Sequence, residues 1–384
     1  MKFIMTKKHT CLLYFGILIL ISSCSKTVQK NPLKRALASK DIRIKRVMDS
    51  LEQYKIQIRY SQIDRENDSI IFTDFDFQVN DNNYFYPAST VKLPASIAAL
   101  EKINEIDSLD RNSKFYIEGD STETTFAKTI EAIFAVSDNS ANNKLVEFLG
   151  FDNINARMQN RGVHPIRISH RLSTSNADDV TTKPLVLYLN DSTIATSKPI
   201  INKSAIALTL NHIKKGKGFY MIDSLYKEPF DFSLKNYYPI TSQHELLKRI
   251  IFPKNFPKKH CFNLSENQHD FLLNAMSTLP KDIGYDSKTF YDSYAKFFMY
   301  GDSKEPIPNN IKIYNKVGYA YGTLTDCAYI KDAKNNVDFM LTTTILVNKD
   351  SIYNNDNYEY DTIGIPFLAQ LGRELYKISL ESKN

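Results

Sequence analysis

The order of secondary-structure patterns along the chain constrains its fold more than any other feature of the sequence. Alternating, β-branched strand patterns occur near the N-terminal end, at 56–60 and 70–77, and return at 311–317, 323–330 and 337–347. Between them, apolar residues recur every three or four positions, which is typical of helices. The predicted fold class is therefore α/β (α+β). An antiparallel sheet is built from the N- and C-terminal parts and flanked by helices, and an all-helical domain is inserted between them.

The domain boundaries are predicted from the same order. The sheet part should comprise 41–88 and 305–384, and the helical part 89–304. Within the helical part, the stretch from about 185 to 238 lacks a clear period, so we expect an insertion made of loops. Its basic run at 214–218 (KKGKG) lacks the strand and helix that flank a phosphate-binding loop, and it is interpreted as a solvated loop.

The N-terminus has the features of an export signal. Residues 1–23 contain three lysines and no acidic residue, followed by an apolar run at 11–21 and then Ile-Ser-Ser before Cys24. The apolar run is too short to span a bilayer comfortably. Because the ending resembles the lipobox of bacterial lipoproteins, Cys24 is the expected lipidation site. Residues 24–40 would then form a polar tether, and the protein would be exported and lipid-anchored to the bacterial cell envelope.

Composition excludes several classes of partner and cofactor. The formal charge of +6 falls to +3 once the predicted signal is removed, because that signal holds three lysines, so no nucleic-acid partner is expected. The seven histidines are scattered, and no CxxC or HExxH motif occurs, so neither a metal site nor a cofactor is predicted. Apart from Cys24, which takes the lipid, the mature chain holds two cysteines, Cys261 and Cys327, and the sequence leaves open whether they form a disulfide.

Ser89 and Lys92 form the first candidate catalytic motif, S-x-x-K, at the start of an apolar helix. A serine there lies near exposed backbone N–H groups, and a lysine three residues later shares its side of the helix. An amine with a lowered pKa can accept the serine proton. The spacing alone is weak evidence, since it also occurs at Ser23, Ser224 and Ser293. In each case a helix cap beside a surface lysine would explain it equally well.

Two further motifs follow in the chain. Residues 137–139 read Ser-Asp-Asn and occur once, between two helical segments where a capping turn is also expected. In the functional interpretation, Ser137 passes a proton and Asn139 donates to a substrate amide. Residues 316–318 read Lys-Val-Gly on a strand. Lys316 would attract a carboxylate, and Gly318 would let a ligand approach the strand backbone.

Taken in order, the three motifs match the set S-x-x-K, S-D-N and K-T-G of penicillin-recognising serine enzymes. The chain resembles the class A-type serine β-lactamase family, in a lipoprotein branch with Bacteroidetes members, over roughly 41–380. The segments at 86–92, 136–143 and 316–328 carry the resemblance. It implies the same fold as the pattern does. It also implies a small-molecule substrate, either a β-lactam or an acyl-D-Ala-like peptide, and a monomer without cofactor.

The resemblance also implies roles for individual residues. Ser89 would be the acylated nucleophile, Lys92 its base, and Ser137 a proton relay. The backbone N–H groups of Ser89 and Tyr319 would form the oxyanion hole. The substrate-binding residues would be Asn139, Lys316, Gly318 and Tyr319.

Two departures from the family pattern limit what is expected. Val317 replaces the usual threonine or serine and removes a hydroxyl. The family reads Arg-Leu-Asp-Arg-x-Glu in the loop after the second motif, whereas 171–176 here read RLSTSN, which places Asn176 at the glutamate position. An amide cannot act as a general base, although Asp178 or Asp179 could substitute if the loop is shifted. We therefore expect an acyl-enzyme that forms but clears slowly.

Three functions are compatible with the sequence. The first is a β-lactam hydrolase, and the second is a related serine acyl enzyme such as a D,D-peptidase or an esterase. The third is a lipid-anchored binding protein that keeps the scaffold without the chemistry. An acyl adduct on Ser89 distinguishes the first two from the third.

Overall fold

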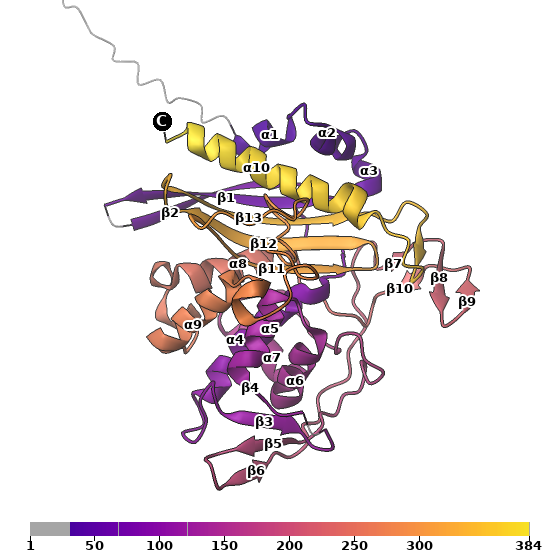
Figure 1. The fold of residues 1–384 in the computed structure, drawn as a ribbon. Coiled ribbons are helices and arrows are strands. Elements are labelled where there is room, and N and C mark those ends of the chain that lie inside the picture. Colours follow the sequence, from indigo (N-terminus) through magenta and orange to yellow (C-terminus); the bar gives the residue numbers. More distant parts are fainter. Residues whose placement is uncertain (1–30, 68, 121, 384) are drawn as a thin grey trace, which may run out of the picture.

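A five-stranded antiparallel sheet lies at the centre of the computed structural model, which describes residues 31–67, 69–120 and 122–383. The predicted signal and Cys24 lie outside the described residues. The strand order is β11-β12-β13-β1-β2, and helices cover both faces (Figure 1). The strands are β1 (Gln57–Glu66), β2 (Ser69–Phe77), β11 (Ile311–Ala320), β12 (Thr323–Asp332) and β13 (Val337–Leu346).

The two ends of the chain meet in this sheet, as the sequence predicts. Strand β1 pairs antiparallel with β13, with Gln57 opposite Thr344 and Gln62 opposite Phe339. Strand β11 pairs only with β12, so it forms one edge of the sheet. The α+β class and the split sheet are therefore confirmed.

The pleat of the strands divides the core into two clusters. On β12, Cys327 and Tyr329 pack with the helical domain, whereas Ala328 and Ile330 pack on the opposite face. This alternation follows from the period of two along a strand. One face is covered by α1 (Pro32–Leu37), α2 (Ile42–Met48), α3 (Leu51–Tyr54) and α10 (Ile365–Glu381), and the other by α8 (Ile240–Ile251).

Helix α1 corrects the predicted tether, which was to extend to residue 40. Leu33, Ala36 and Leu37 are buried in the cluster between the sheet and α10. These three residues have the i, i+3, i+4 spacing of a helical stripe, and the side chain of Asn31 caps the helix by accepting from the Lys34 N–H. The short stripe lies among basic residues, and for that reason the segment was interpreted as a tether.

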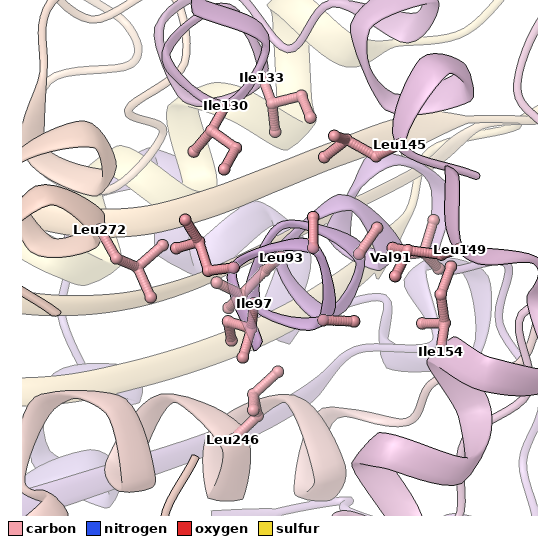
Figure 2. Packing of buried hydrophobic residues seen from close by; sticks show 14 of the residues in the cluster. Val91, Leu93, Ile97, Ile130, Ile133, Leu145, Leu149, Ile154, Leu246 and Leu272 are labelled. Carbon is pink, nitrogen blue, oxygen red and sulfur yellow. The ribbon is translucent and has the colours of Figure 1, made fainter. Parts of the chain in front are cut away.

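Helix α4 (Lys92–Ile103) forms the centre of the helical domain and begins directly after the Ser89 turn. Figure 2 shows Leu93 and Ile97 of α4 surrounded by apolar side chains from five other helices. Because the helix is buried on nearly all sides, its N-terminus is held firmly in place. The surrounding helices are α5 (Phe126–Ala135), α6 (Asn139–Leu149), α7 (Phe151–Asn160), α8 and α9 (Glu266–Ser277).

The segment 185–238 contains short strands, which corrects the expectation of loops. Two of them pair with distant parts of the chain: β5 with β3, and β8 with β14 of the C-terminal part. Phe232 and Tyr237 of this segment pack on Tyr84 and Tyr86, just before Ser89. The short strands are β3 (Lys114–Ile117), β4 (Thr124–Thr125), β5 (Leu185–Tyr188), β6 (Ile194–Thr196), β7 (Lys214–Lys215), β8 (Gly218–Met221), β9 (Ser224–Tyr226), β10 (Phe230–Asp231) and β14 (Ile352–Tyr353).

Two smaller points follow from the described residues. Cys261 and Cys327 are both free thiols, so the question of their pairing is answered. None of the helices described in the structure combines the length and the apolar character that crossing a bilayer would need.

Candidate active site

Ser89 lies in a short 3-10 turn, Ala88–Val91, that leads into α4. The Thr90 hydroxyl closes the turn by donating to the Pro87 carbonyl at 2.7 Å, and Ala88 adopts a φ of 47°. A non-glycine residue in this left-handed region is strained, and such strain often occurs at functional sites. The Lys92 N–H donates to the Ser89 carbonyl. The turn therefore brings the nucleophile and the lysine together, as the S-x-x-K spacing predicts.

Gly318 allows the edge strand β11 to lie directly against this turn. A Cβ atom at Gly318 would come within 2.7 Å of the Pro87 carbonyl oxygen and 2.9 Å of the Ser89 nitrogen. Only a residue without a side chain fits such an approach. Because β11 is an edge strand, half of its N–H groups have no strand partner. This is the place where the predicted oxyanion hole of Ser89 and Tyr319 would form.

The Lys92 amine lies at the base of the site and is fully buried. It donates to the Asn139 Oδ1 at 2.7 Å, to the Ser137 hydroxyl at 3.3 Å and to the Ser137 carbonyl. Burial lowers the pKa of Lys92 to about 7, although the nearby charge of Asp138 opposes the shift. A neutral amine is therefore accessible at neutral pH.

Lys316 reaches the same serine from the other side. Its amine donates to the Ser137 hydroxyl at 2.8 Å and to the Val317 carbonyl at 2.9 Å, and its side chain is buried. Burial and the charge of Lys92 hold the pKa of Lys316 well below its usual value. The Ser137 oxygen thus accepts from two amines, which leaves its own proton free for a third group.

The Ser-Asp-Asn motif combines capping with the site chemistry. Asp138 is the N-cap of α6 and accepts from the Ala141 N–H at 2.7 Å, as expected for a capping turn. Ser137, held at a φ of 58°, and Asn139 on the other side of the cap both bind Lys92. The capping interpretation therefore holds for Asp138, and the interpretation as site residues holds for Ser137 and Asn139.

Helix α6 also holds the loop that follows, residues 170–183. Asn139 and Asn143 lie one turn apart on the same face. The Asn139 amide donates to the Ser173 hydroxyl at 3.0 Å, and Asn143 binds both the N–H and the carbonyl of Leu172, at 3.0 and 2.8 Å. Helix α6, on one side of the site, therefore positions the 170–183 loop on the other side.

One turn further along α6, Glu147 binds Arg171 in a buried ion pair. Both guanidinium contacts are short, at 2.6 and 2.9 Å, and the two side chains are 3% and 1% exposed. Arg171 also donates to the carbonyls of Asp179 at 2.6 Å and Thr181 at 3.1 Å. Arg171 is therefore the residue around which the loop folds.

The loop carboxylates do not line the cleft in the part of the chain that the structure describes. Asp178 is 74% exposed on its side chain and pairs with Lys235 at 3.3 Å. The Asn176 amide oxygen accepts from the Thr174 hydroxyl at 2.7 Å. The loop residues that do line the cleft are Ser173, Thr174 and Ala177, together with His170, Arg171 and Leu172.

The sequence analysis missed His170, which lines the same cleft. Its ring lies nearly parallel to that of Tyr86, with centroids 5.9 Å apart. The Nδ1 proton is donated to the Arg171 carbonyl at 2.6 Å, and among the described residues the buried Nε2 has no partner. Burial lowers the pKa of His170 to about 4, so the ring is neutral at physiological pH. In the sequence, only its position directly before Arg171 could have identified His170 as a residue of the site.

The cleft at Ser89 has a volume of about 460 Å³ and is rich in tyrosine. Only Tyr319, which is 51% exposed, was predicted among these rings. Of the others, Tyr86 and Tyr321 lie within the first and third motif segments, whereas Tyr358 and Tyr360 come from the segment before α10, where no motif marks them. The tyrosines lining the cleft are Tyr86, Tyr319, Tyr321, Tyr358 and Tyr360.

The structure brings together every predicted site residue that it describes. Ser89, Asn139 and Tyr319 line this cleft. Behind Asn139, Lys92, Ser137 and Lys316 form a hydrogen-bonded chain, and Gly318 lies against the Ser89 turn. Val317 instead points into the core on the far face of the sheet, so a hydroxyl at this position would be buried there. Within the described ranges, no group of histidine, cysteine, aspartate or glutamate side chains could hold a metal ion.

The order of the three motifs, on this fold, matches the pattern of penicillin-recognising serine enzymes. Residues 41–246, more than half of the chain, match the model of the beta-lactamase enzyme family. The chain therefore belongs to this family.

Solved structures share the fold at low sequence identity. A class A β-lactamase from Bacteroides cellulosilyticus is 13% identical and aligns with a TM-score of 0.52, covering 92% of this chain and 99% of the other. A β-lactamase from Streptosporangium roseum is also 13% identical, with a TM-score of 0.51 and coverage of 88% and 97%. A class A enzyme from Mycobacterium abscessus is 14% identical, with a TM-score of 0.50 and coverage of 87% and 98%. No curated protein matches the sequence significantly.

Proposed function

We propose that the protein opens β-lactams by forming an acyl-enzyme on Ser89. The observation that carries this proposal is the buried Lys92 amine, whose pKa is lowered to about 7 next to the Ser89 turn. A neutral amine there can accept a proton at physiological pH, which a surface lysine cannot do. Family membership supports a small-molecule substrate.

The acylation step can be written with these groups. The Ser89 oxygen attacks the lactam carbonyl carbon, and its proton passes to neutral Lys92. When Lys92 is protonated, its three protons match its three acceptors on Ser137 and Asn139. Deprotonation leaves two protons and a lone pair that can point to Ser89. The C–N bond then breaks, and the nitrogen receives a proton through Ser137, while Lys316 attracts the substrate carboxylate.

The loop after the second motif offers no evident base for deacylation, and the carboxylate that does line the cleft, Asp356, comes from the C-terminal part of the chain. Hydrolysis of the Ser89 ester needs a water and a group that accepts its proton. Among the described residues, Asp178 and Asp179 are not part of the cleft lining, Asp178 pairs with Lys235, and Asn176 bonds to Thr174. His170 is neutral, but its Nε2 is closed off from solvent. The proposed acyl-enzyme therefore clears slowly.

Intact-mass spectrometry after incubation with benzylpenicillin tests the proposal. We expect an adduct of one penicillin per chain, lost in Ser89→Ala. Ser293→Ala is the matched control, because Ser293 also begins an S-x-x-K motif, but it is buried and donates to the Ser303 carbonyl. An adduct that survives in Ser89→Ala would contradict the assignment of the nucleophile.

The absence of a carboxylate of the 170–183 loop from the cleft lining also favours a second candidate function. The same Ser89 acyl-enzyme can form from a different acyl donor, a peptide in a D,D-peptidase or an ester in an esterase, with D-alanine or an alcohol as the leaving group. Release of D-alanine from an acyl-D-Ala-D-Ala peptide, faster than turnover of nitrocefin, would favour this alternative. If neither benzylpenicillin nor the peptide forms an adduct, the protein is a binding protein or acts on another substrate.

We further propose that the protein is exported and anchored through lipid on Cys24, and that it acts as a monomer. The basic, apolar and small-residue order before Cys24 supports this localisation. Membrane fractionation of Cys24→Ala provides the test, because this variant should leave the membrane fraction. A variant that stays membrane-bound would overturn the anchor.

A further inference from the structure

A second cavity lies away from the Ser89 cleft and shares no lining residue with it. Its volume is about 730 Å³, against about 460 Å³ for the cleft. It is enclosed by three parts of the chain: the N-terminal stretch 51–85, the inserted stretch 212–216, and the C-terminal strands with the loop after them, 323–353. A volume of this size is typical of cavities that bind small organic molecules.

The charges around this second cavity are mostly positive. Lys55, His212, Lys214 and Lys215 line it, whereas Glu52 is its one acidic lining residue. Glu52 pairs with Lys55 at 2.6 Å, but its side chain is 94% exposed, so this pair is screened by water. The cavity therefore carries an excess of positive charge.

Lys215 is the unbalanced group in the cavity. Within the described residues its amine has no hydrogen bond or ion pair, and its nearest recorded contact is the Tyr84 ring at 5.9 Å. Burial and the charge of Lys55 lower the pKa of Lys215 to about 8, so it remains mainly protonated at neutral pH. Lys215 is half-buried and therefore only partly hydrated, and an anion would supply the counter-charge that no described residue provides.

A neutral group in the cavity lining also lacks a partner. Asn348 is 8% exposed and donates through its Nδ2 to the Ile352 carbonyl at 3.1 Å, while its buried Oδ1 is unpaired among the described residues. An amide oxygen requires a donor such as a hydroxyl or an N–H. Lys215 and Asn348 thus lack opposite kinds of partner.

The inserted stretch 212–216 packs closely against the loop that contains Ser351 and Tyr353, beside the second cavity. Gly216 has a φ of 77°, and a Cβ atom there would lie 2.5 Å from the Ser351 carbonyl oxygen and 2.6 Å from the Tyr353 ring. Strand β8, two residues later, pairs with β14. The backbone therefore holds Lys215 over the cavity.

We propose that this cavity is a second ligand site, which binds a small organic anion that also carries hydroxyl donors. The anionic group lies at Lys215 with Lys55 and Lys214, and a hydroxyl donates to Asn348. Binding does not depend on the Ser89 chemistry, so its test stands apart from that of the proposed function.

The test measures binding to the mature chain by ligand-observed NMR with three matched probes. Glucose 6-phosphate carries both features, inorganic phosphate only the charge, and glucose only the hydroxyls. We expect glucose 6-phosphate to bind at least tenfold more tightly than either of the others. Equal affinity for glucose 6-phosphate and phosphate, or for glucose 6-phosphate and glucose, overturns the proposal, as does the absence of binding.

Variants place the binding in the cavity. Lys215→Met should weaken glucose 6-phosphate at least tenfold, whereas Lys217→Met, in the same inserted stretch but outside the lining, should leave the affinity unchanged. Lys55→Met, on the rim, gives an independent test that does not disturb buried packing, with an expected loss of at least threefold. Affinity that is unchanged in both Lys215→Met and Lys55→Met overturns the site.

Discussion

The two walls of the Ser89 cleft both contain buried charges but use them differently. On the wall made by the Ser89 turn, α6 and β11, Lys92 and Lys316 have no carboxylate partner and converge on one hydroxyl. On the opposite wall, Arg171 is neutralised by Glu147 and by loop carbonyls. A buried charge that is fully paired holds structure together, whereas one without a counter-ion has a shifted pKa and is available for chemistry.

This comparison separates acylation of Ser89 from deacylation, the two halves of the expected reaction. The lysine wall has the base, the relay and the anion-binding group that acylation needs. The arginine wall lines the cleft with His170, Arg171, hydroxyls and apolar groups, and neither Asp178 nor Asp179 is part of that lining. The following predictions test this difference, starting with the largest expected effect.

Lys92→Met removes the base on the lysine wall. The rate of acylation by benzylpenicillin should fall by about 10²–10⁴-fold, the usual contribution of a general base. Folding should be preserved, because the side chain is fully buried and methionine has a similar volume. Stopped-flow measurement of acylation provides the test, and a loss of less than tenfold would remove Lys92 from this role.

Arg171→Met breaks the central pair of the arginine wall. The free energy of unfolding should fall by about 3–5 kcal/mol, because Glu147 is left buried without its partner. Urea denaturation measures this change. The double variant Arg171→Met with Glu147→Leu should recover much of the loss, and a single variant as stable as the wild type would contradict a structural role for the pair.

Gly318→Ala tests the close approach of β11 to the Ser89 turn. The added methyl group would meet the Pro87 oxygen and the Ser89 nitrogen, so the turn must shift. Acylation should slow by about 10²-fold, which is the effect of displacing a reacting group by about 1 Å. Gly284→Ala serves as a control for backbone strain away from the site, because its added Cβ meets no atom within 4 Å but its φ of 89° disfavours alanine. Equal acylation rates in the two variants would disprove the contact.

The pH dependence of acylation reports on Lys92. Protonated Lys92 cannot accept the serine proton, so the rate should rise about tenfold per pH unit below about 7 and level off above it. This profile is obtained by following acylation between pH 5 and 9. A rate that is flat over this range, or one that falls as the pH rises, would contradict the lowered pKa.

Asp178→Ala and Asp179→Ala should have the smallest effect. Neither carboxylate lines the cleft, and the exposed pair of Asp178 with Lys235 contributes little. Loss of the acyl adduct should change by less than about twofold in either variant. A tenfold slower loss in one of them would identify that aspartate as the missing base.

Local patterns in the sequence were sufficient for the fold and for part of the site. The split sheet follows from strand alternation at both ends of the chain. Each of the three site motifs is a contiguous stretch of sequence. Helix α1 was missed because its apolar stripe is a single turn long among lysines and arginines. His170 and the tyrosines reach the cleft only through tertiary contacts, and the pairing of Arg171 with Glu147 depends on how the loop folds onto α6. Such tertiary contacts leave no repeating pattern of apolar and polar residues in the local sequence.

The most direct test of the difference between the two walls is a nitrocefin time course under enzyme-limited conditions. The account predicts a burst of about one equivalent of opened nitrocefin, followed by a much slower steady state, with the Ser89 adduct persisting in intact-mass spectra. Rapid, linear turnover without a burst, and without an accumulated adduct, would contradict it.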